Sequence, residues 1–537
     1  MRKFTCLAVV IIALSACTQT AEKQNINLDQ ALADVNVEEY KNHLAFLSSD
    51  ELMGRFPGEP GYDTAAAYVE RLVRKMGLQP GGADGTYRQP IGFTKAILKP
   101  STISVKLDGK ELKHEEDFVM SAVTEDVSFS GQIVFVGAGI DAPEQGYSDL
   151  DGLDLEGKVA MYLWRTVPED LGIIERAVSV NLIQDKLIER GAVGMISVMT
   201  REAMSRYPWP LIKWLVSRPK MAYVSEDPKP YRAGLAVSYK TADAWFAKDG
   251  KKLPELIAQI KSGTPASYET SLTIEVQSSS ERQQITSDNV AAILEGSDPE
   301  LKDEYLVMTA HLDHDGISNP VEGDSIYNGT MDNASGSAAL LVLADKLSQM
   351  KLKRSIMFLW VTAEERGLLG SEYFAKYPTI SADQIVANQN IDGISNLIAA
   401  AKDMIVFGYE YSNLSESADY SLAQLGLDRA EDPKPEETYF IRSDQYSFVK
   451  EGIPAIWISG GYTSLYDSID ALAVSDAWTA ERYHKPSDDM DQPINFEAGM
   501  TEVKANLLIA HHIANELDSV QWDKDGFLYK TFKEGKE

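Results

Sequence analysis

Residues 305–313 read YLVMTAHLD. The first six residues are an apolar run of strand length without the alternation of a half-exposed strand, so they predict a strand buried on both faces. Comparable runs occur at residues 355–362, 385–391 and 454–459, and helix-like segments at residues 333–350 and 368–377 lie between them. This alternation predicts an α/β fold with a mostly parallel, mixed sheet flanked by helices on both faces.

The buried strands end in side chains that can bind a metal ion. His311 ends the first run, Glu364 and Glu365 follow the second, and Asp392 follows the third. Because the carboxyl ends of parallel strands meet at one edge of a sheet, we expect these side chains to lie close together.

Two further candidates stand outside the strands. Asp332 lies at the start of the helix-like segment 333–350, next to small residues that let backbone and carboxylate approach a site. His484 lies in the segment Tyr483 to Asp488. The other histidines, His43, His114, His511 and His512, have no such context and are expected to be surface or packing residues.

The ligand types predict which metal would bind. The only cysteines are Cys6 and Cys17, so a metal site must use His, Asp and Glu. That set suits zinc, and less selectively manganese or cobalt. Two histidines and three carboxylates can hold two ions with one carboxylate bridging them, and the cations would then lower the pKa of a bridging water until it is a nucleophile at neutral pH.

Five motifs occur in a specific order from residue 311 to residue 488. They are His-x-Asp at 311–313, Asp-Asn-Ala-Ser-Gly at 332–336, Thr-Ala-Glu-Glu-x-Gly at 362–367, Asn-x-Asp at 390–392 and His-x-Pro-x-Asp at 484–488. In this order they resemble metallopeptidase family twenty-eight of clan MH, which includes leucyl aminopeptidases, aminopeptidase Y and glutamate carboxypeptidases. Residues 47–55 resemble the N-terminal segment of the same family.

The resemblance implies a role for each ligand position. His311 and Asp392 would bind a first zinc, Glu365 and His484 a second, and Asp332 would bridge the two Zn²⁺ ions. None of these five positions is altered in this chain.

Two more residues receive roles from the resemblance. Glu364 would be the general base, passing a proton from water to the leaving amine, although in isolation Glu364 and Glu365 also fit a solvated helix start. Asp313 would accept the free ring N–H of His311. The resemblance gives no ligand role to His314 and Asp315. Gln445 stands where relatives often have His, which puts in doubt only an outer or substrate contact.

A separate α/β module is predicted ahead of the motifs, at residues 126–277. Strand-like residues 132–136 and 155–163, a helical stretch at 181–190 and another strand-like run at 191–198 follow in order. This region resembles the protease-associated domain inserted in some peptidases. The peptidase domain would then comprise residues 35–125 and 278–537, with the long polar loop 316–331 at the rim of its pocket.

The first 34 residues read as an export signal followed by a tether. Arg2 and Lys3 precede an apolar run at residues 7–14, which is too short to span a bilayer because a span takes ~20 residues. Residues 14–17, Leu-Ser-Ala-Cys, resemble a lipobox, which predicts signal removal after residue 16 and a lipid on Cys17. Plain secretion with an unmodified Cys17 is the alternative. Residues 17–34 would be a polar tether, and the protein would face the periplasm or the cell exterior.

Composition and charge narrow the choice of partners. The formal net charge of -30 argues against nucleic acid, which needs clustered Lys and Arg. An aminopeptidase acting on peptides is favoured over a carboxypeptidase or dipeptidase, because Arg442 is the only readable candidate to bind a terminal carboxylate. The sequence does not give the preferred residue, the oligomeric state or the membrane leaflet.

Three other classes are weaker alternatives. The aminoacylase and carboxypeptidase-G type usually inserts a lid after the Glu-Glu pair, and the spacing from Glu365 to Asp392 leaves no room for one. Glutaminyl cyclases resemble residues 332–336 less and bind one zinc. A receptor built on this scaffold would have lost ligands, whereas all are present here.

Overall fold

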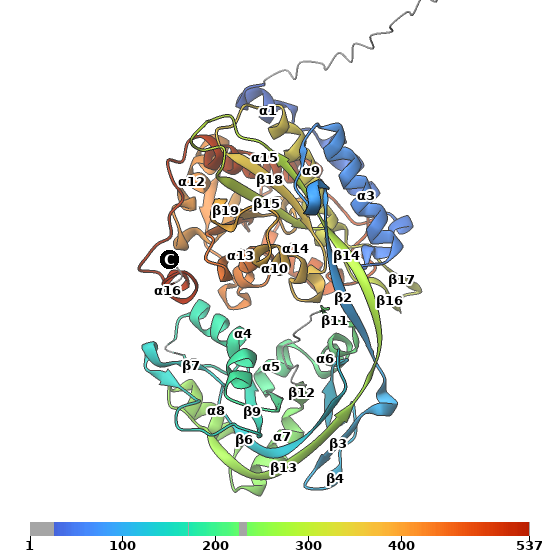
Figure 1. Cartoon of the computed structure of the whole chain (residues 1–537), viewed down its shortest axis with the longest axis vertical. Coiled ribbons are helices and arrows are strands. Elements are labelled where there is room, and N and C mark those ends of the chain that lie inside the picture. Colours follow the sequence, from blue (N-terminus) through green and yellow to red (C-terminus); the bar gives the residue numbers. More distant parts are fainter. Residues whose placement is uncertain (1–25, 170, 225–233, 536–537) are drawn as a thin grey trace, which may run out of the picture.

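The computed structural model describes residues 26–169, 171–224 and 234–535. The chain forms two units, each built on its own large sheet (Figure 1). Two long strands, β2 (Arg88–Leu98) and β14 (Ser280–Leu294), run from one unit to the other and pair antiparallel along their length. The second unit is therefore joined to the first by a continuous two-stranded ribbon.

The first unit contains a ten-stranded mixed sheet. Its central strands, β18 (Ser355–Val361), β15 (Tyr305–His311), β19 (Ile385–Asn390) and β22 (Ala455–Gly460), are parallel neighbours in that order. The flanking strands β14 and β20 (Asp403–Phe407) are antiparallel to them. The predicted mixed α/β fold is confirmed: four parallel strands form the centre of the sheet, and β20 makes a further parallel pair with β21 (Asp428–Ala430) at one edge.

Helices cover both faces of this sheet. Successive residues of a strand point to opposite faces, so neighbouring residues of one strand belong to different cores. Leu306 and Met308 of β15 belong to one core with α2 (Val37–Leu47), α3 (Pro60–Lys75), α9 (Ser335–Ser348) and α15 (Phe496–Asn515). Val307 belongs to a second core with α10 (Leu369–Lys376) and α13 (Gln445–Lys450) on the other face. Every residue of β18 is buried, as expected for a strand covered on both sides.

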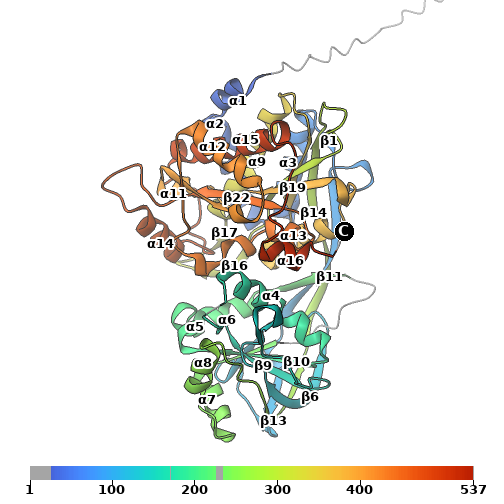
Figure 2. The same cartoon turned by 90° about the vertical axis from the view of Figure 1, so that its left-hand side faces the viewer.

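The second unit is an eight-stranded sheet with its own helices, seen below the first unit in Figures 1 and 2. Its strand order is β4 (Lys110–Glu111), β3 (Ser104–Leu107), β13 (Tyr268–Ser278), β6 (Val127–Phe135), β9 (Val159–Trp164), β10 (Gly194–Met199), β12 (Gly234–Val237) and β5 (Phe118–Met120). Helices α4 (Ile173–Glu189), α5 (Arg201–Arg206), α6 (Trp209–Ser217), α7 (Tyr239–Lys248) and α8 (Leu253–Lys261) accompany it. The predicted order of strand, strand, helix and strand is present as β6, β9, α4 and β10.

The observed boundaries of this unit differ from residues 126–277. Strands β3, β4 and β5 lie before residue 126 and pair into the second sheet, so the unit begins near Ser104. They were missed because they have only two to four residues, too few to show a periodic pattern. Conversely, β11 (Lys220–Tyr223) lies within the predicted range but pairs with β2 in the first sheet.

The predicted tether also ends earlier than residue 34. Residues 17–25 lie outside the described residues, as does the signal segment, but Leu28–Asp34 forms α1. The side chain of Asn27 caps this helix, and Ala31 is fully buried in the core of the first unit. Within the described ranges, no helix has both the length and the apolar character needed to cross a membrane.

Candidate metal centre

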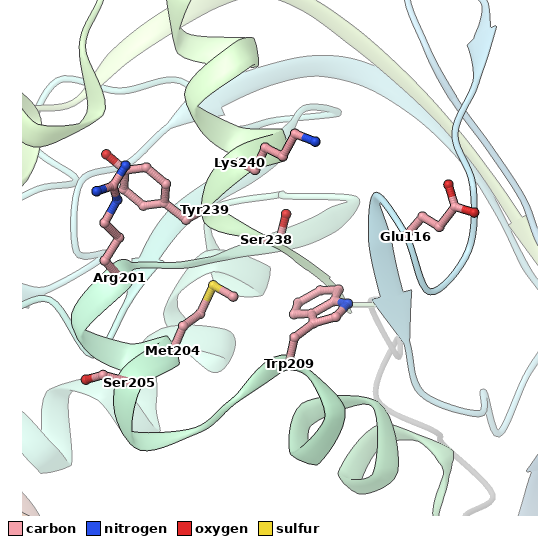
Figure 3. A pocket seen from close by; sticks show the side chains of 8 residues that line it. All are labelled: Glu116, Arg201, Met204, Ser205, Trp209, Ser238, Tyr239 and Lys240. Atoms are coloured by element: carbon pink, nitrogen blue, oxygen red, sulfur yellow. The ribbon is translucent and has the colours of Figure 1, made fainter.

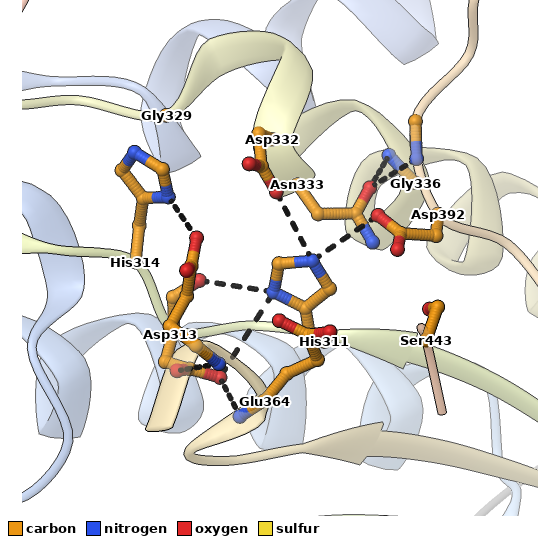
Figure 4. Close-up of polar contacts among 12 residues, drawn as sticks. His311, Asp313, His314, Gly329, Asp332, Asn333, Gly336, Glu364, Asp392 and Ser443 are labelled. Carbon is orange, nitrogen blue, oxygen red and sulfur yellow. Dashed lines mark hydrogen bonds and ion pairs between the residues drawn. The ribbon is translucent and has the colours of Figure 1, made fainter. Parts of the chain in front are cut away.

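His311, the last residue of β15, lies between two carboxylates. Its Nε2 atom is 3.2 Å from Asp332 Oδ1 and 3.2 Å from Asp392 Oδ1, and the three residues form a group with the spacing of a cation site (Figure 4). Burial disfavours the charged ring, but Glu364 and Asp392 outweigh it and raise the pKa of His311 well above its ordinary value. A cation at this position would replace that proton.

Asp313 supports the site differently from the expectation. The carbonyl oxygen of Asp313, not its carboxylate, accepts a hydrogen bond from His311 Nδ1 at 3.2 Å, whereas the carboxylate is 4.0 Å away. The carboxylate instead accepts the backbone N–H groups of Glu364 at 3.1 Å and of Glu365 at 3.3 Å. The predicted contact to the His311 ring is therefore corrected: the Asp313 side chain fixes the turn that carries both glutamates.

Asp332 lies between two histidines. Its Oδ1 faces His311, and its Oδ2 is 3.4 Å from His484 Nε2. The backbone before it is held by the buried carboxylate of Asp488, which accepts the N–H groups of Met331 at 3.0 Å and of Asp332 at 3.2 Å. One carboxylate thus presents one oxygen to each half of the centre.

Asn333 connects this turn to the loop that carries Asp392. Its side chain donates to the carbonyl of Ile391 at 2.9 Å and accepts the N–H groups of Gly336 at 2.8 Å and Gly393 at 2.9 Å (Figure 4). Asp332 and Asp392 are therefore positioned by a shared set of hydrogen bonds, although 60 positions separate them in sequence.

The two adjacent glutamates have different surroundings. Glu365 is buried and belongs to two cation-sized groups, one with His314 and Asp332 and one with Asp315 and His484. Glu364 belongs to none of the groups found among the described residues. Burial, reinforced by the neighbouring carboxylates, raises the pKa of Glu364 well above its ordinary value, so this side chain can hold a proton.

His484 is held by Asp315, which the motif comparison had given no ligand role. His484 Nδ1 is 2.8 Å from Asp315 Oδ2, which leaves Nε2 directed at Asp332. Asp315 also accepts hydrogen bonds from the guanidinium groups of Arg218 and Arg366. Burial alone would raise the pKa of Asp315, but these two cations hold it well below its ordinary value.

Arg218 lies between α6, a helix of the second unit, and β11, which pairs into the first sheet. Its guanidinium is also 3.3 Å from Glu365 Oε2 and 5.2 Å from the ring of Trp214 on α6. The Trp214 ring in turn lies edge-on to His484, with centroids 6.4 Å apart. Residues 214 and 218 were missed because nothing in their local sequence marks them, and only the folded chain brings them to the centre.

Arg55 fixes the backbone beneath the site. It is fully buried and donates to the carbonyls of Leu312 at 2.8 Å, Asn328 at 2.6 Å and Gly329 at 3.0 Å. This explains the resemblance of residues 47–55 to the family segment in structural terms: the segment supplies a cation that organises the loops before and after the hairpin β16 (Gly316–Val321) and β17 (Asp324–Tyr327).

Gln445 and the remaining histidines lie outside the centre. Gln445 is buried, accepts from Asn390 at 2.7 Å and donates to the Phe440 carbonyl at 2.7 Å. Its side chain therefore holds Asn390, the last residue of β19, in place. The other four histidines were expected to be surface or packing residues, and His43 and His512 contact the hydroxyl groups of Tyr68 and Ser417. Within the ranges that the structure covers, none of the four belongs to a cation-sized group.

A cavity of about 480 Å³ lies in the second unit, away from these residues (Figure 3). Its lining includes Arg201, Trp209, Tyr239 and Lys240, with the Arg201 guanidinium 4.5 Å over the Tyr239 ring. It contains none of the predicted ligands. The chemistry expected from the sequence is therefore located at the edge of the first sheet.

Comparison with known proteins agrees with this location. Residues 289–508 match the model of Peptidase family M28. The chain is 27% identical over 308 residues to a probable leucine aminopeptidase 2 of Aspergillus oryzae, covering 55% of this chain and 54% of that protein. It is 26% identical over 274 residues to aminopeptidase Y of Saccharomyces cerevisiae, covering 47% of this chain and 42% of that protein. The chain thus spans about half the length of the curated relatives it matches.

A solved structure matches nearly the whole chain. The aminopeptidase from Aneurinibacillus sp. strain AM-1 superposes with a TM-score of 0.54 at 19% identity, covering 91% of this chain and 96% of that one. Both units, and not only the region matched by the family model, therefore share an architecture with that protein.

We expect Asp315→Asn to weaken the binding of a cation at this centre by about 10- to 100-fold, as loss of an outer carboxylate partner of a ligating histidine does. The neutral amide would hold the His484 ring less firmly and would remove the negative charge that Arg218 and Arg366 share. Calorimetric titration of metal-free protein with Zn²⁺ measures this. Asp324→Asn, on the exposed hairpin, is the control, and equal affinities in both variants would contradict the role of Asp315.

Proposed function

We propose that this chain is an exported, two-zinc exopeptidase that removes N-terminal residues from peptides. The observation that carries the proposal is the placement of Asp332, whose two carboxylate oxygens face two different histidines. Each histidine is accompanied by a further carboxylate, Asp392 beside His311 and Glu365 beside His484. A carboxylate shared between two such half-sites is suited to bridge a pair of cations.

The donor set fits zinc. Imidazole nitrogens and carboxylate oxygens meet with no thiol among the candidate ligands, and the repulsion among buried carboxylates calls for bound positive charge. When two such ions are bound, they lower the pKa of a water between them and so supply a nucleophile at neutral pH.

Glu364 is suited to move the proton of that water to the leaving amine. Its backbone is fixed by Asp313, and its side chain stays outside the cation-sized groups. Burial and the neighbouring carboxylates raise the pKa of Glu364 above its ordinary value, which favours a carboxyl that can take up a proton. The partner glutamate, Glu365, is better placed to bind a cation.

The charge of the site supports recognition of a free ammonium group. Carboxylates dominate the surroundings, and the guanidinium groups of Arg218 and Arg366 are both engaged by Asp315. The match to leucine aminopeptidases and aminopeptidase Y supports the same substrate end.

A carboxypeptidase or dipeptidase is the second candidate, and one observation favours it. The sequence showed no arginine cluster near the ligands, whereas the fold brings Arg218 within 3.3 Å of Glu365 and Arg366 to the same carboxylate, Asp315. These two cations would suit a terminal carboxylate if a substrate displaced Asp315 from them.

A matched substrate panel separates the two candidates. Zinc-loaded protein should hydrolyse leucine amides and dipeptides with a free amino group, including those whose carboxyl group is amidated, because the ammonium is the recognised end. N-acetylated versions of the same peptides should be cleaved at least about 100-fold more slowly, as expected for a lost charge-assisted contact. Cleavage of N-acetylated but not C-amidated peptides would instead indicate a carboxypeptidase.

The variants Glu364→Gln and Glu365→Gln should fail in different ways. Glu364→Gln preserves shape but removes the proton acceptor, so two zinc ions should remain while turnover falls by about 10²-fold or more. Glu365→Gln should lose one ion, because it replaces a ligand. Elemental analysis and steady-state kinetics on the same samples measure both effects. Near wild-type turnover of Glu364→Gln with its metal in place would assign the base elsewhere.

Export and anchoring form the remaining part of the proposal, supported by the charged start, the short apolar run and the lipobox at residues 14–17. The mature protein would begin at a lipidated Cys17 and face the periplasm or the cell exterior. It should partition into detergent, and mass spectrometry of its N-terminal peptide should find acyl chains on Cys17. An N-terminal peptide with unmodified Cys17 would contradict the anchor.

A further inference from the structure

His314 is a fully buried histidine beside the second half of the centre. It follows His311 by three positions, and its Nδ1 atom is 2.8 Å from Glu365 Oε1. In Figure 4 its ring lies next to Gly329 and on the same side of the view as Asp332. No part of the proposed function described so far uses this side chain.

The His314 ring lacks the hydrogen bonds that a buried imidazole normally makes. Among the described residues, neither ring nitrogen has a partner of acceptable hydrogen-bond geometry, and Glu365 Oε1 has none either. The Nδ1 atom of His314 and the Oε1 atom of Glu365 therefore approach to 2.8 Å without good hydrogen-bond alignment. Burying such polar atoms unpaired is costly, so a shared partner between them would relieve the cost of both.

The spacing around His314 is that of a ligand set. His314, Asp332 and Glu365 each offer an atom, and the three atoms lie within 4.8 Å of one another. The rings of His314 and His484 have centroids 5.5 Å apart with an angle of 45° between their planes. Two imidazoles on one zinc at an N–Zn–N angle of about 110°, with Zn–N of about 2 Å, would have centroids roughly 5 Å apart.

The backbone holds the ring in this place from two sides. Gly329 has a left-handed φ of 59°, and a Cβ at that position would collide with the His314 ring. Arg55 donates to the Gly329 carbonyl at 3.0 Å, and its own carbonyl accepts the backbone N–H of His314 at 3.3 Å. The ring is therefore pre-positioned, as a ligand needs to be.

We propose that His314 is a fourth protein ligand of the second metal position, together with Asp332, Glu365 and His484. This inference rests on the proposed two-metal function and makes the two positions unequal. The first would have His311, Asp392 and the shared Asp332. The second would have the group of His314, Glu365 and Asp332, joined by His484, whose Nε2 is 3.4 Å from Asp332. Because it has more protein ligands, the second position should bind its ion more tightly, and the first should exchange its ion more readily.

Cobalt-substituted protein tests the proposal by counting ligands without measuring activity. Proton NMR of the Co²⁺-loaded full chain in water should show three strongly shifted, exchangeable imidazole N–H signals, from His311, His314 and His484. His314→Gln should remove one signal and lower the affinity of the tighter site by at least about 10-fold, as loss of a ligand or its partner does. His43→Gln, which replaces a half-buried histidine bonded to Tyr68 far from the ligands in sequence, should keep all three.

The outcomes separate this inference from the function on which it rests. Two Co²⁺ ions per chain by elemental analysis with only two shifted imidazole signals in the unmodified protein would overturn the role of His314 and leave the two-metal centre intact. Fewer than two bound ions would overturn the two-metal function and this inference with it. The count in the unmodified protein decides the matter even if a variant fails to fold.

Discussion

The concentration of carboxylates at one edge of the first sheet is the constraint on which the rest of the centre depends. Burial raises the pKa of Asp313 to about 6 and that of Asp444, the residue before α13, to about 7, and it raises the pKa of Glu364 well above its ordinary value. Such a group is stable only if positive charge or directed N–H groups offset the repulsion. The fold supplies backbone N–H groups to Asp313 and Asp488 and guanidinium groups to Asp315. The remaining carboxylates, Asp332, Glu365 and Asp392, are those that face histidines and are available to bind cations.

This electrostatic requirement also explains how the second unit takes part in the centre. Arg218 lies just after α6 of that unit, yet its guanidinium reaches Asp315 and Glu365 in the first. Through Asp315 the same contact extends to His484. A displacement of the second unit would remove a cation from the carboxylate that orients this histidine. The position of the second unit and the geometry of the second half-site are therefore linked by the buried ion pairs of Arg218 and by the contact of the Trp214 ring with His484.

The sequence predicted the parts of this arrangement that are locally encoded. Buried strands can be predicted from apolar runs, and β15, β18 and β19 lie where those runs occur. The candidate ligands His311, Glu365 and Asp392 lie at or just beyond the ends of these strands. The contacts of Asp315 were not predictable in this way, because Arg218 lies 97 positions away and Arg366 lies 51 positions away. The carboxylate of Asp313 was assigned to the wrong donor for a related reason. Spacing places it near His311, but only the backbone geometry decides that the carbonyl meets the ring and the carboxylate meets the next turn.

The arginines near the centre bear on whether the centre would recognise the amino end or the carboxyl end of a peptide. A sequence without a visible arginine cluster favoured an aminopeptidase, and the fold removes that argument by placing Arg218 and Arg366 at Asp315. A different argument favours the aminopeptidase, and it rests on how the charges of the centre are paired. Both guanidinium groups already contact a buried carboxylate that orients His484, so recruiting them to a substrate would expose Asp315 to Glu365 without compensation. A free ammonium would need no such rearrangement, because it would take no guanidinium group away from Asp315.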